Sequence, residues 1–403
     1  MKNQLNFEKG GLVVLKFPEY AQKCIDTITQ NGFSAYFVGG CVRDGLLGRA
    51  CDDIDIATSA LPNEIITLFE RTIPTGLKHG TVTVLIDDHP IEVTTFRRES
   101  GYIDSRHPDS VSFVSNIQED LSRRDFTINA LAATSSGEII DLFGGLKDLE
   151  TGIIRAVGDP ETRFTEDALR IVRAFRFACV LGFEIEEITK KAALKLSERI
   201  EKISGERVLK ELYKAASYGN LLPLCELISS GALECFGISN IKLEDACLNR
   251  LSILELSPSS KLALLILMCD FDIDLIKNSL KADNHLIKKI KITDSLAACE
   301  IPETQADIQK LLYMHHHEYV RLYFYYLGVV NLADSEKLFN LYNEVCAQDR
   351  PYRISHLSVD GNDLLELGLQ GVQIKSSLEK ALFAVIDGKI ENTKESIIGF
   401  LKN

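Results

Sequence analysis

The pattern of apolar residues changes near Gly145. Before this point, short stretches with apolar residues at alternate positions are separated by turn-forming residues, which is typical of β-strands. Beyond it, apolar residues recur every three or four positions almost to the C-terminus, which is typical of amphipathic helices. We therefore predict a mixed α+β unit at the N-terminus and an essentially all-helical remainder.

The N-terminal part contains several short stretches with strand-like alternation. They are residues 35–38, 81–86, 91–96, 131–134 and 138–143. The polar segments 87–90 and 135–137 each separate two of these stretches, and this spacing predicts two β-hairpins. We expect a small mixed sheet accompanied by helices.

Length and composition indicate a globular chain with more than one packed unit. The 403 residues exceed what one hydrophobic core usually organises, and 45% of them are hydrophobic while 26% are charged. No apolar run approaches the roughly 20 residues of a membrane helix, and the N-terminus has no signal-peptide core. We therefore expect a cytoplasmic protein without a membrane partner.

Cysteine usage and net charge limit the kinds of site and partner. The ten cysteines include no CxxC pair, which favours reduced thiols over a disulfide framework or a zinc site. The formal net charge of -13 shows that the chain is not generally basic. Any nucleic-acid partner must therefore be held by local basic patches.

Two aspartates, Asp53 and Asp55, are candidate metal ligands. In a strand, residues two positions apart share a face, so both carboxylates point one way while Ile54 and Ile56 point the other. Neighbouring carboxylates suit Mg²⁺, although such a pair alone is more often two solvated acids. Glu92, in a nearby predicted strand, could supply a third carboxylate.

A glycine pair precedes these aspartates. Gly39 and Gly40 follow a predicted strand and open a short helix that Gly48 can end. Such a turn lets backbone amides approach phosphate groups, although a glycine pair alone more often serves only the turn geometry. Arg43, three residues after Gly40, favours phosphate binding.

Two later stretches carry further arginines. Arg123 and Arg124 are adjacent and could bind triphosphate oxygens through paired N–H donors. A helix is predicted from about residue 165, with Thr165 as its N-cap and with Asp167 and Arg170 as neighbours one turn apart. On an arbitrary helix, the last two would form a surface ion pair worth under about 1 kcal/mol.

Base chemistry suggests another role for Asp167 and Arg170. Cytosine and adenine both present an exocyclic amine beside a ring-nitrogen acceptor, whereas uracil and guanine present a carbonyl beside a ring N–H. A fixed carboxylate next to a fixed guanidinium would therefore accept C and A and reject U and G. Arg173 and Arg176 continue at steps of three and suit phosphate or primer contacts.

Together these stretches resemble the class II tRNA nucleotidyltransferases, which are the CCA-adding enzymes of bacteria within the DNA polymerase β-like superfamily. Recognisable similarity covers about residues 36–214, and residues 363–368 resemble the family's tail element. The matching stretches, in family order, are 39–44 (GGCVRD), 53–58 (DIDIAT), 78–82 (KHGTV), 92–97 (EVTTFR), 123–127 (RRDFT) and 166–170 (EDALR).

The resemblance implies a polymerase β-like nucleotidyltransferase head followed by helical parts. These are a catalytic head at 1–146, a base-recognising neck at 147–205, a body at 206–304 and a tRNA-binding tail at 305–403. It also implies that Asp53 and Asp55 hold Mg²⁺, which would activate the tRNA 3′-hydroxyl for attack on the α-phosphate and stabilise departing pyrophosphate. The implied nucleotide-binding residues are Gly40, Arg43 and Arg124 for the incoming CTP or ATP, Asp167 and Arg170 for its base, and Arg173 and Arg176 for the rest of the pocket.

The expected function is template-independent addition of CCA to tRNA. The segment from Arg97 to Pro108 resembles the flexible loop that CC-adding relatives lack, so CC-only addition is disfavoured. An A-adding enzyme and a poly(A) polymerase remain alternatives, as does an RNA-binding protein with an inactive head.

No histidine is followed by aspartate, so an HD phosphohydrolase domain is not expected. The run His315–His317 and the aromatic residues after it are expected to pack rather than bind.

Overall fold

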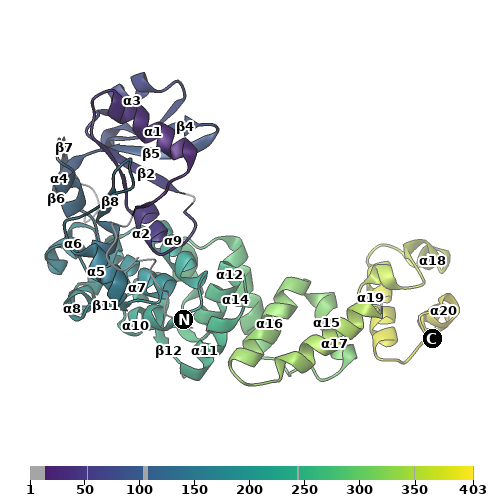
Figure 1. Cartoon of the computed structure of the whole chain (residues 1–403). Coiled ribbons are helices and arrows are strands. Elements are labelled where there is room, and N and C mark those ends of the chain that lie inside the picture. Colours follow the sequence, from purple (N-terminus) through teal and green to yellow (C-terminus); the bar gives the residue numbers. More distant parts are fainter. Residues whose placement is uncertain (1–13, 52, 103–107, 243–244, 349, 403) are drawn as a thin grey trace. The chain divides into compact units, whose positions relative to one another are not determined.

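The computed structural model describes residues 14–402, apart from 52, 103–107, 243–244 and 349. The chain forms two compact units (Figure 1). The first comprises residues up to Asn240 together with Asp274–Lys281, and the second comprises Ile241–Ile273 and the chain from Ala282 onward. The four-part division expected from the resemblance stays a prediction.

The first unit is built on a seven-stranded sheet with the order β3-β4-β5-β2-β1-β8-β9. Neighbouring strands are antiparallel except for β2 and β5, which are parallel. This arrangement confirms the predicted mixed sheet. The strands are β1 (Ala35–Val38), β2 (Ile54–Thr58), β3 (Thr72–Gly76), β4 (Thr81–Ile86), β5 (His89–Thr95), β8 (Leu131–Ala133) and β9 (Ile139–Asp141).

The turn between β4 and β5 is tighter than predicted. Only Asp87 and Asp88 lie outside the strands, with left-handed φ values of 50° and 63°. Two such residues form the turn whose twist matches that of a hairpin. His89 and Pro90 were wrongly predicted as loop residues, because they pair with Ile86 and Leu85 in the antiparallel ladder. The predicted β8–β9 hairpin is confirmed.

Two strands of the first unit were not predicted. These are β6 (Arg97–Tyr102) and β7 (Pro108–Phe113), which pair as a separate antiparallel ribbon. They occupy most of the segment expected to be a flexible loop, and residues 103–107 of that segment lie outside the described residues. Strand β3 at the sheet edge was also missed, because its residues carry no clear alternation.

Helices cover the sheet. The helix α1 (Glu19–Gln30) packs on the sheet through Ala21, Ile25 and Ile28, which are fully buried and spaced along one face. The other α-helices of the first unit are α2 (Gly40–Leu46), α3 (Pro62–Leu68), α4 (Ile117–Ser122), α5 (Gly145–Thr151), α6 (Pro160–Glu166), α7 (Leu169–Leu181), α8 (Glu187–Lys195), α9 (Gly205–Ala216), α10 (Leu222–Ser229) and α13 (Ile273–Asn278), of which α13 begins one residue before the second segment of this unit. Short strands β10 (Ile153–Ile154) and β11 (Glu184–Ile185) pair in the region that was expected to be all helical.

The second unit is almost entirely helical, as predicted. One core joins α14 to α17, and a second joins α18 to α20. Tyr323 and Phe324 are buried in the first core, so the aromatic stretch does pack there. The helices are α11 (Asp245–Ile253), α12 (Pro258–Leu267), α14 (Asn284–Ala297), α15 (Gln305–Met314), α16 (His317–Val329), α17 (Ser335–Ala347), α18 (Gly361–Glu366), α19 (Val372–Ile386) and α20 (Lys394–Lys402). Within the described residues, every helix is too short or too polar to cross a membrane.

Candidate active site

The glycine turn brings three of the predicted site residues together. Gly39 has a φ of 71°, and α2 begins directly after it. A Cβ atom at this position would lie 2.9 Å from Nη1 of Arg124 and 3.7 Å from Oδ2 of Asp55. Glycine is therefore required both for the left-handed backbone and for the close approach of these side chains.

The predicted carboxylates meet at the centre of the sheet. Asp53 immediately precedes β2, and Asp55 lies within it beside buried Ile54 and Ile56. Because β2 and β5 are parallel neighbours, Asp55 stands opposite Glu92 in the register. The pKa of Asp55 is raised to about 6 by burial and by the charge of Glu92, with a smaller contribution from Asp53, while Arg124 opposes the shift.

These carboxylates fit a divalent cation. Burial and the nearby charges of Glu92 and Asp53 disfavour the ionised form of Asp55, and a bound cation would favour that form. Mg²⁺ is usually bound through one or two carboxylates together with substrate phosphates and water, which matches Asp53 and Asp55. Over the described part of the chain, no group of three or more His, Cys, Asp or Glu side chains is placed to hold a metal ion by itself.

The raised pKa of Asp55 predicts an effect of pH on stability. Its value is about 6 in the folded protein against an ordinary 3.8. Protonation of Asp55 therefore stabilises the folded protein fully below about pH 4, and this stabilisation is lost as the pH rises through about 6. Asp55→Asn is expected to increase the free energy of unfolding of the metal-free protein by about 1–2 kcal/mol near pH 8.

Urea unfolding in the presence of a chelator would measure this difference. The gain from Asp55→Asn should shrink toward zero as the pH falls to about 3, because Asp55 is then largely protonated in both the folded and the unfolded state. A gain that is the same at both pH values would contradict the assignment of the shift to this carboxyl group.

The helix predicted from about residue 165 is interrupted between α6 and α7. Two predictions about this segment are therefore wrong. Thr165 does not cap a helix but lies inside α6, whose N-cap is Asp159, with its carboxylate accepting from the amide of Thr162. Pro160 at the first helical position fixes this earlier start. Asp167 has extended backbone angles (φ -144°, ψ 106°), so it does not share a helix with Arg170.

Asp167 and Arg170 still line the same cavity on either side of this interruption. Each side chain forms its ion pair with a different residue rather than with the other. The carboxylate of Asp167 accepts from the amide of Leu169 at 3.1 Å and pairs with Arg207 at 2.8 Å. Arg170 pairs with Glu166 at 2.6 Å. Across the described residues, the simple ion pair between Asp167 and Arg170 is not formed. Both side chains are instead oriented by their surroundings.

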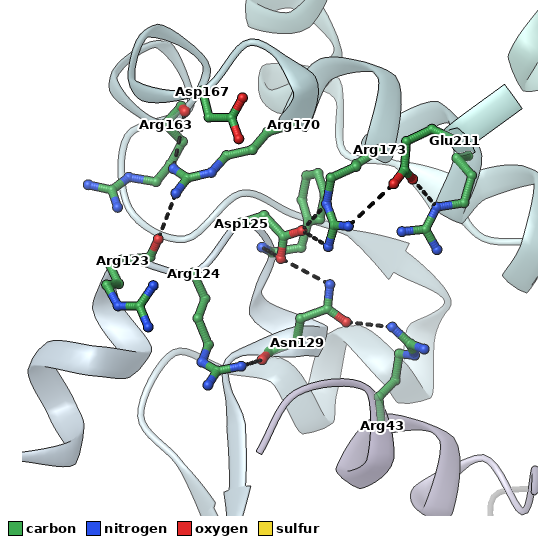
Figure 2. A network of polar contacts seen from close by, with 12 residues as sticks. Arg43, Arg123, Arg124, Asp125, Asn129, Arg163, Asp167, Arg170, Arg173 and Glu211 are labelled. Atoms are coloured by element: carbon green, nitrogen blue, oxygen red, sulfur yellow. Dashed lines mark hydrogen bonds and ion pairs between the residues drawn. The ribbon is translucent and has the colours of Figure 1, made fainter. Parts of the chain in front are cut away.

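A continuous polar network joins α2, the segment after α4, α7 and α9 (Figure 2). Arg43 donates to the side-chain oxygen of Asn129 at 2.6 Å, and the amide of Asn129 donates to Asp125 at 3.0 Å. Asp125 accepts from Arg173 at 2.6 and 2.9 Å. Burial alone would raise the pKa of Asp125, but Arg173 and Asn129 hold it well below its usual value. The network thus fixes buried charges in pairs.

The network continues into α9 through Glu211. This carboxylate is 5% exposed and lies 2.8 Å from Nε of Arg176 and 3.7 Å from Nη1 of Arg173. At the other end, the backbone oxygen of Asn129 accepts from Arg124, as Figure 2 shows. Asn129 therefore orients Arg43 and Arg124, while Glu211 orients Arg173 and Arg176.

One cavity of about 630 Å³ collects most of the predicted site. It is lined by Asp53, Asp55 and by the predicted nucleotide-binding residues Gly40, Arg43, Arg124, Asp167, Arg170, Arg173 and Arg176. Glu92, which is the register partner of Asp55, is not part of this lining. The volume suits a nucleotide-sized ligand, and the excess of guanidinium groups suits an anionic one.

The sequence prediction missed the contribution of α9. Arg207 and Lys214 line the cavity, and Glu211 lies between them. Positions 207, 211 and 214 follow helical spacing, so the three side chains share one face of α9. The spacing of these charged residues could have indicated that α9 contributes to the site. On its own, however, such a row of charged residues is typical of a solvated helix face.

Two protein-family models match parts of this chain. The family model described as the poly A polymerase head domain matches residues 35–155, and the model described as the probable RNA and SrmB-binding site of polymerase A matches residues 182–236.

Two relatives and one solved structure match nearly the whole chain. The CCA-adding enzyme of Lactobacillus delbrueckii subsp. bulgaricus is 38% identical over 94% of this chain and 96% of its own length. The CCA-adding enzyme of Enterococcus faecalis is 38% identical over 95% of both chains. The crystal structure of the Bacillus stearothermophilus CCA-adding enzyme in complex with CTP is 32% identical, with a TM-score of 0.75 over 95% of this chain and 96% of that chain.

Proposed function

Because this chain belongs to the family of CCA-adding enzymes, we propose that it extends tRNA 3′ ends with CCA from CTP and ATP, without a nucleic-acid template. The observation that carries the proposal is a single cavity. It joins the carboxylates suited to a metal, the arginines suited to a triphosphate and the pair suited to reading a base. Each of these alone has commoner structural uses, and their convergence on one cavity supports the proposal.

The triphosphate end of the nucleotide is assigned to the glycine turn. Arg43 and Arg124 flank the turn at Gly39–Gly40, and each is oriented by Asn129. Guanidinium groups fixed in this way bind phosphate oxygens without first losing side-chain entropy. The same turn holds Arg124 close to Asp55, which places the phosphates beside the carboxylates.

The family uses a divalent metal, and we assign Mg²⁺ to Asp53 and Asp55, with Glu92 as the third catalytic carboxylate. When bound, the metal lowers the pKa of the attacking 3′-hydroxyl and stabilises the departing pyrophosphate. Asp53 and Asp55 must both be ionised to hold it. Glu92 stands opposite Asp55 in the register of the parallel strands β2 and β5, which supports its assignment as the third carboxylate.

Base choice is assigned to Asp167 and Arg170. The carboxylate of Asp167 is fixed by Arg207 and by the amide of Leu169, and it retains lone pairs that can accept from an exocyclic amine. Arg170 offers donors to a ring nitrogen. This order of acceptor and donor matches cytosine and adenine and opposes uracil and guanine.

The helical regions after the head are assigned by the family resemblance. We propose that residues 147–205 complete nucleotide recognition, that residues 206–304 form a body, and that residues 305–403 contact tRNA. The catalytic head then ends near residue 146. An A-adding enzyme or a poly(A) polymerase would use the same cavity, and an inactive RNA-binding protein would not.

Sequencing of reaction products separates these functions. The protein would be incubated with tRNAs that lack A, CA or CCA, with CTP and ATP offered singly and together. We expect each end to be completed to CCA and then to stop growing. Addition of A only to CC-ended tRNA would indicate an A-adding enzyme, and a long A tail would indicate a poly(A) polymerase. No addition at all would favour an RNA-binding protein.

A further inference from the structure

The aromatic ring of Phe177 contacts guanidinium groups from two helices. The Cζ atom of Arg176 lies 3.5 Å from the ring centroid, and those of Arg43 and Arg173 lie 5.0 and 5.3 Å from it. Arg43 belongs to α2, whereas the other two belong to α7 with Phe177 itself. The ring is 3% exposed and lines the nucleotide-sized cavity.

Carboxylates compensate these three arginines one by one. Asp44 pairs with Arg43 at 2.7 Å, and Glu211 holds Arg176. Burial and the charge of Arg173 lower the pKa of Arg176 to about 10 despite Glu211. An aromatic face attracts a cation without neutralising it. The ring can therefore hold the guanidinium groups together without adding a further negative charge beside them.

We propose that Phe177 is a positioning residue for nucleotide binding, whose π face holds Arg43, Arg173 and Arg176 in their binding geometry. The inference rests on the proposed function, in which Arg43 contacts the phosphates and the α7 arginines complete the pocket. Phe177 contacts both sets directly. The competing view is that the ring only fills space, as its edge-on contact with Phe126 at 5.8 Å would suggest.

Fluorination of the ring separates the two views. Phenylalanines with one, two and three fluorine atoms would be introduced at position 177 by suppression of a stop codon. Fluorine withdraws electron density and weakens cation–π attraction stepwise, while the volume of the ring changes little. We expect KM for CTP and ATP to rise with each fluorine, by about tenfold in total. The value of kcat at saturating nucleotide should stay nearly constant.

Phe175 provides the matched control. It lies on the same helix and is fully buried, and in the described structure no guanidinium group lies over its ring. The same fluorine series at Phe175 should leave KM unchanged. A flat KM across the Phe177 series, or an equal rise in the Phe175 series, would overturn the proposal.

A second readout distinguishes this inference from the proposed function. Discrimination of CTP and ATP from UTP and GTP should survive fluorination, because Asp167 and Arg170 do not contact the ring. If the unmodified protein adds no nucleotide, the proposed function fails, and equilibrium binding of CTP then tests the inference by itself. In that assay, CTP affinity should fall with each fluorine at Phe177, and unchanged affinity would overturn the proposal.

Discussion

Asp53→Ala is expected to reduce nucleotide addition on the order of a thousandfold, while the protein stays folded. Asp53 is exposed at the start of β2, so its removal creates no buried cavity. The free energy of unfolding should change by no more than about 0.5 kcal/mol. The loss arises because one of two carboxylates that hold the metal is gone, and the reacting oxygens then lose its charge stabilisation.

Single-turnover incorporation of CTP into tRNA, over a range of Mg²⁺ concentrations, measures this effect. Glu70→Ala is a suitable control, because Glu70 is an exposed acid of the same unit that does not line the cavity. It should retain full activity. Retention of full activity by Asp53→Ala would refute the metal assignment, and loss of activity together with unfolding would leave Asp53 a structural residue.

Asp167→Asn and Arg170→Ala are expected to relax the choice among the four nucleoside triphosphates by roughly ten- to a hundredfold. Asparagine keeps an oxygen that can accept from the amide of Leu169, so the start of α7 should persist. It loses the charge that pairs with Arg207 and adds donors that clash with an exocyclic amine. Selectivity should therefore fall more than triphosphate affinity.

The ratio of kcat/KM for CTP over UTP, and for ATP over GTP, is the required measurement. Lys190→Ala is a matched control, because Lys190 forms an ion pair with Glu226 in the same unit but does not line the cavity. It should leave both ratios unchanged. Ratios that stay at the wild-type level in Asp167→Asn and Arg170→Ala would remove the idea that these side chains act as the template.

Local signals in the sequence predicted part of the sheet and the glycine turn. Alternating apolar residues identified β1 and β4 with their observed bounds, and Gly39–Gly40 marked a turn that requires glycine. These features depend on neighbouring residues in the sequence. The edge strand β3 has mostly exposed side chains and no alternation to reveal it, so the periodicity could not find it.

The start of the helix that contains Thr165 was predicted wrongly, because two residues could cap a helix there. Thr165 and Asp159 are both good N-caps, and Pro160 decides in favour of Asp159. Asp167 and Arg170 nevertheless both line the cavity, from either side of the interruption between α6 and α7, and their assignment to the base stays a prediction. The types of these two residues therefore indicated a shared cavity correctly, whereas the predicted helix through both of them was wrong.

The roles of α9 and Phe177 could not be predicted, because they depend on tertiary partners. Glu211 looks like a surface acid in the sequence, and its burial follows only from Arg173 and Arg176 on another helix. Phe177 looks like an ordinary core residue on an apolar helix face. Its contact with Arg43, far away in the sequence, appears only when α2 packs near α7.

Equilibrium binding of the four nucleoside triphosphates to the protein without any RNA tests the central claim most directly. If the protein itself selects the base, CTP and ATP should bind at least about tenfold more tightly than UTP and GTP. This difference should vanish in Asp167→Asn. Equal binding of all four nucleotides, with selectivity emerging only when tRNA is added, would contradict the claim that these side chains replace a template.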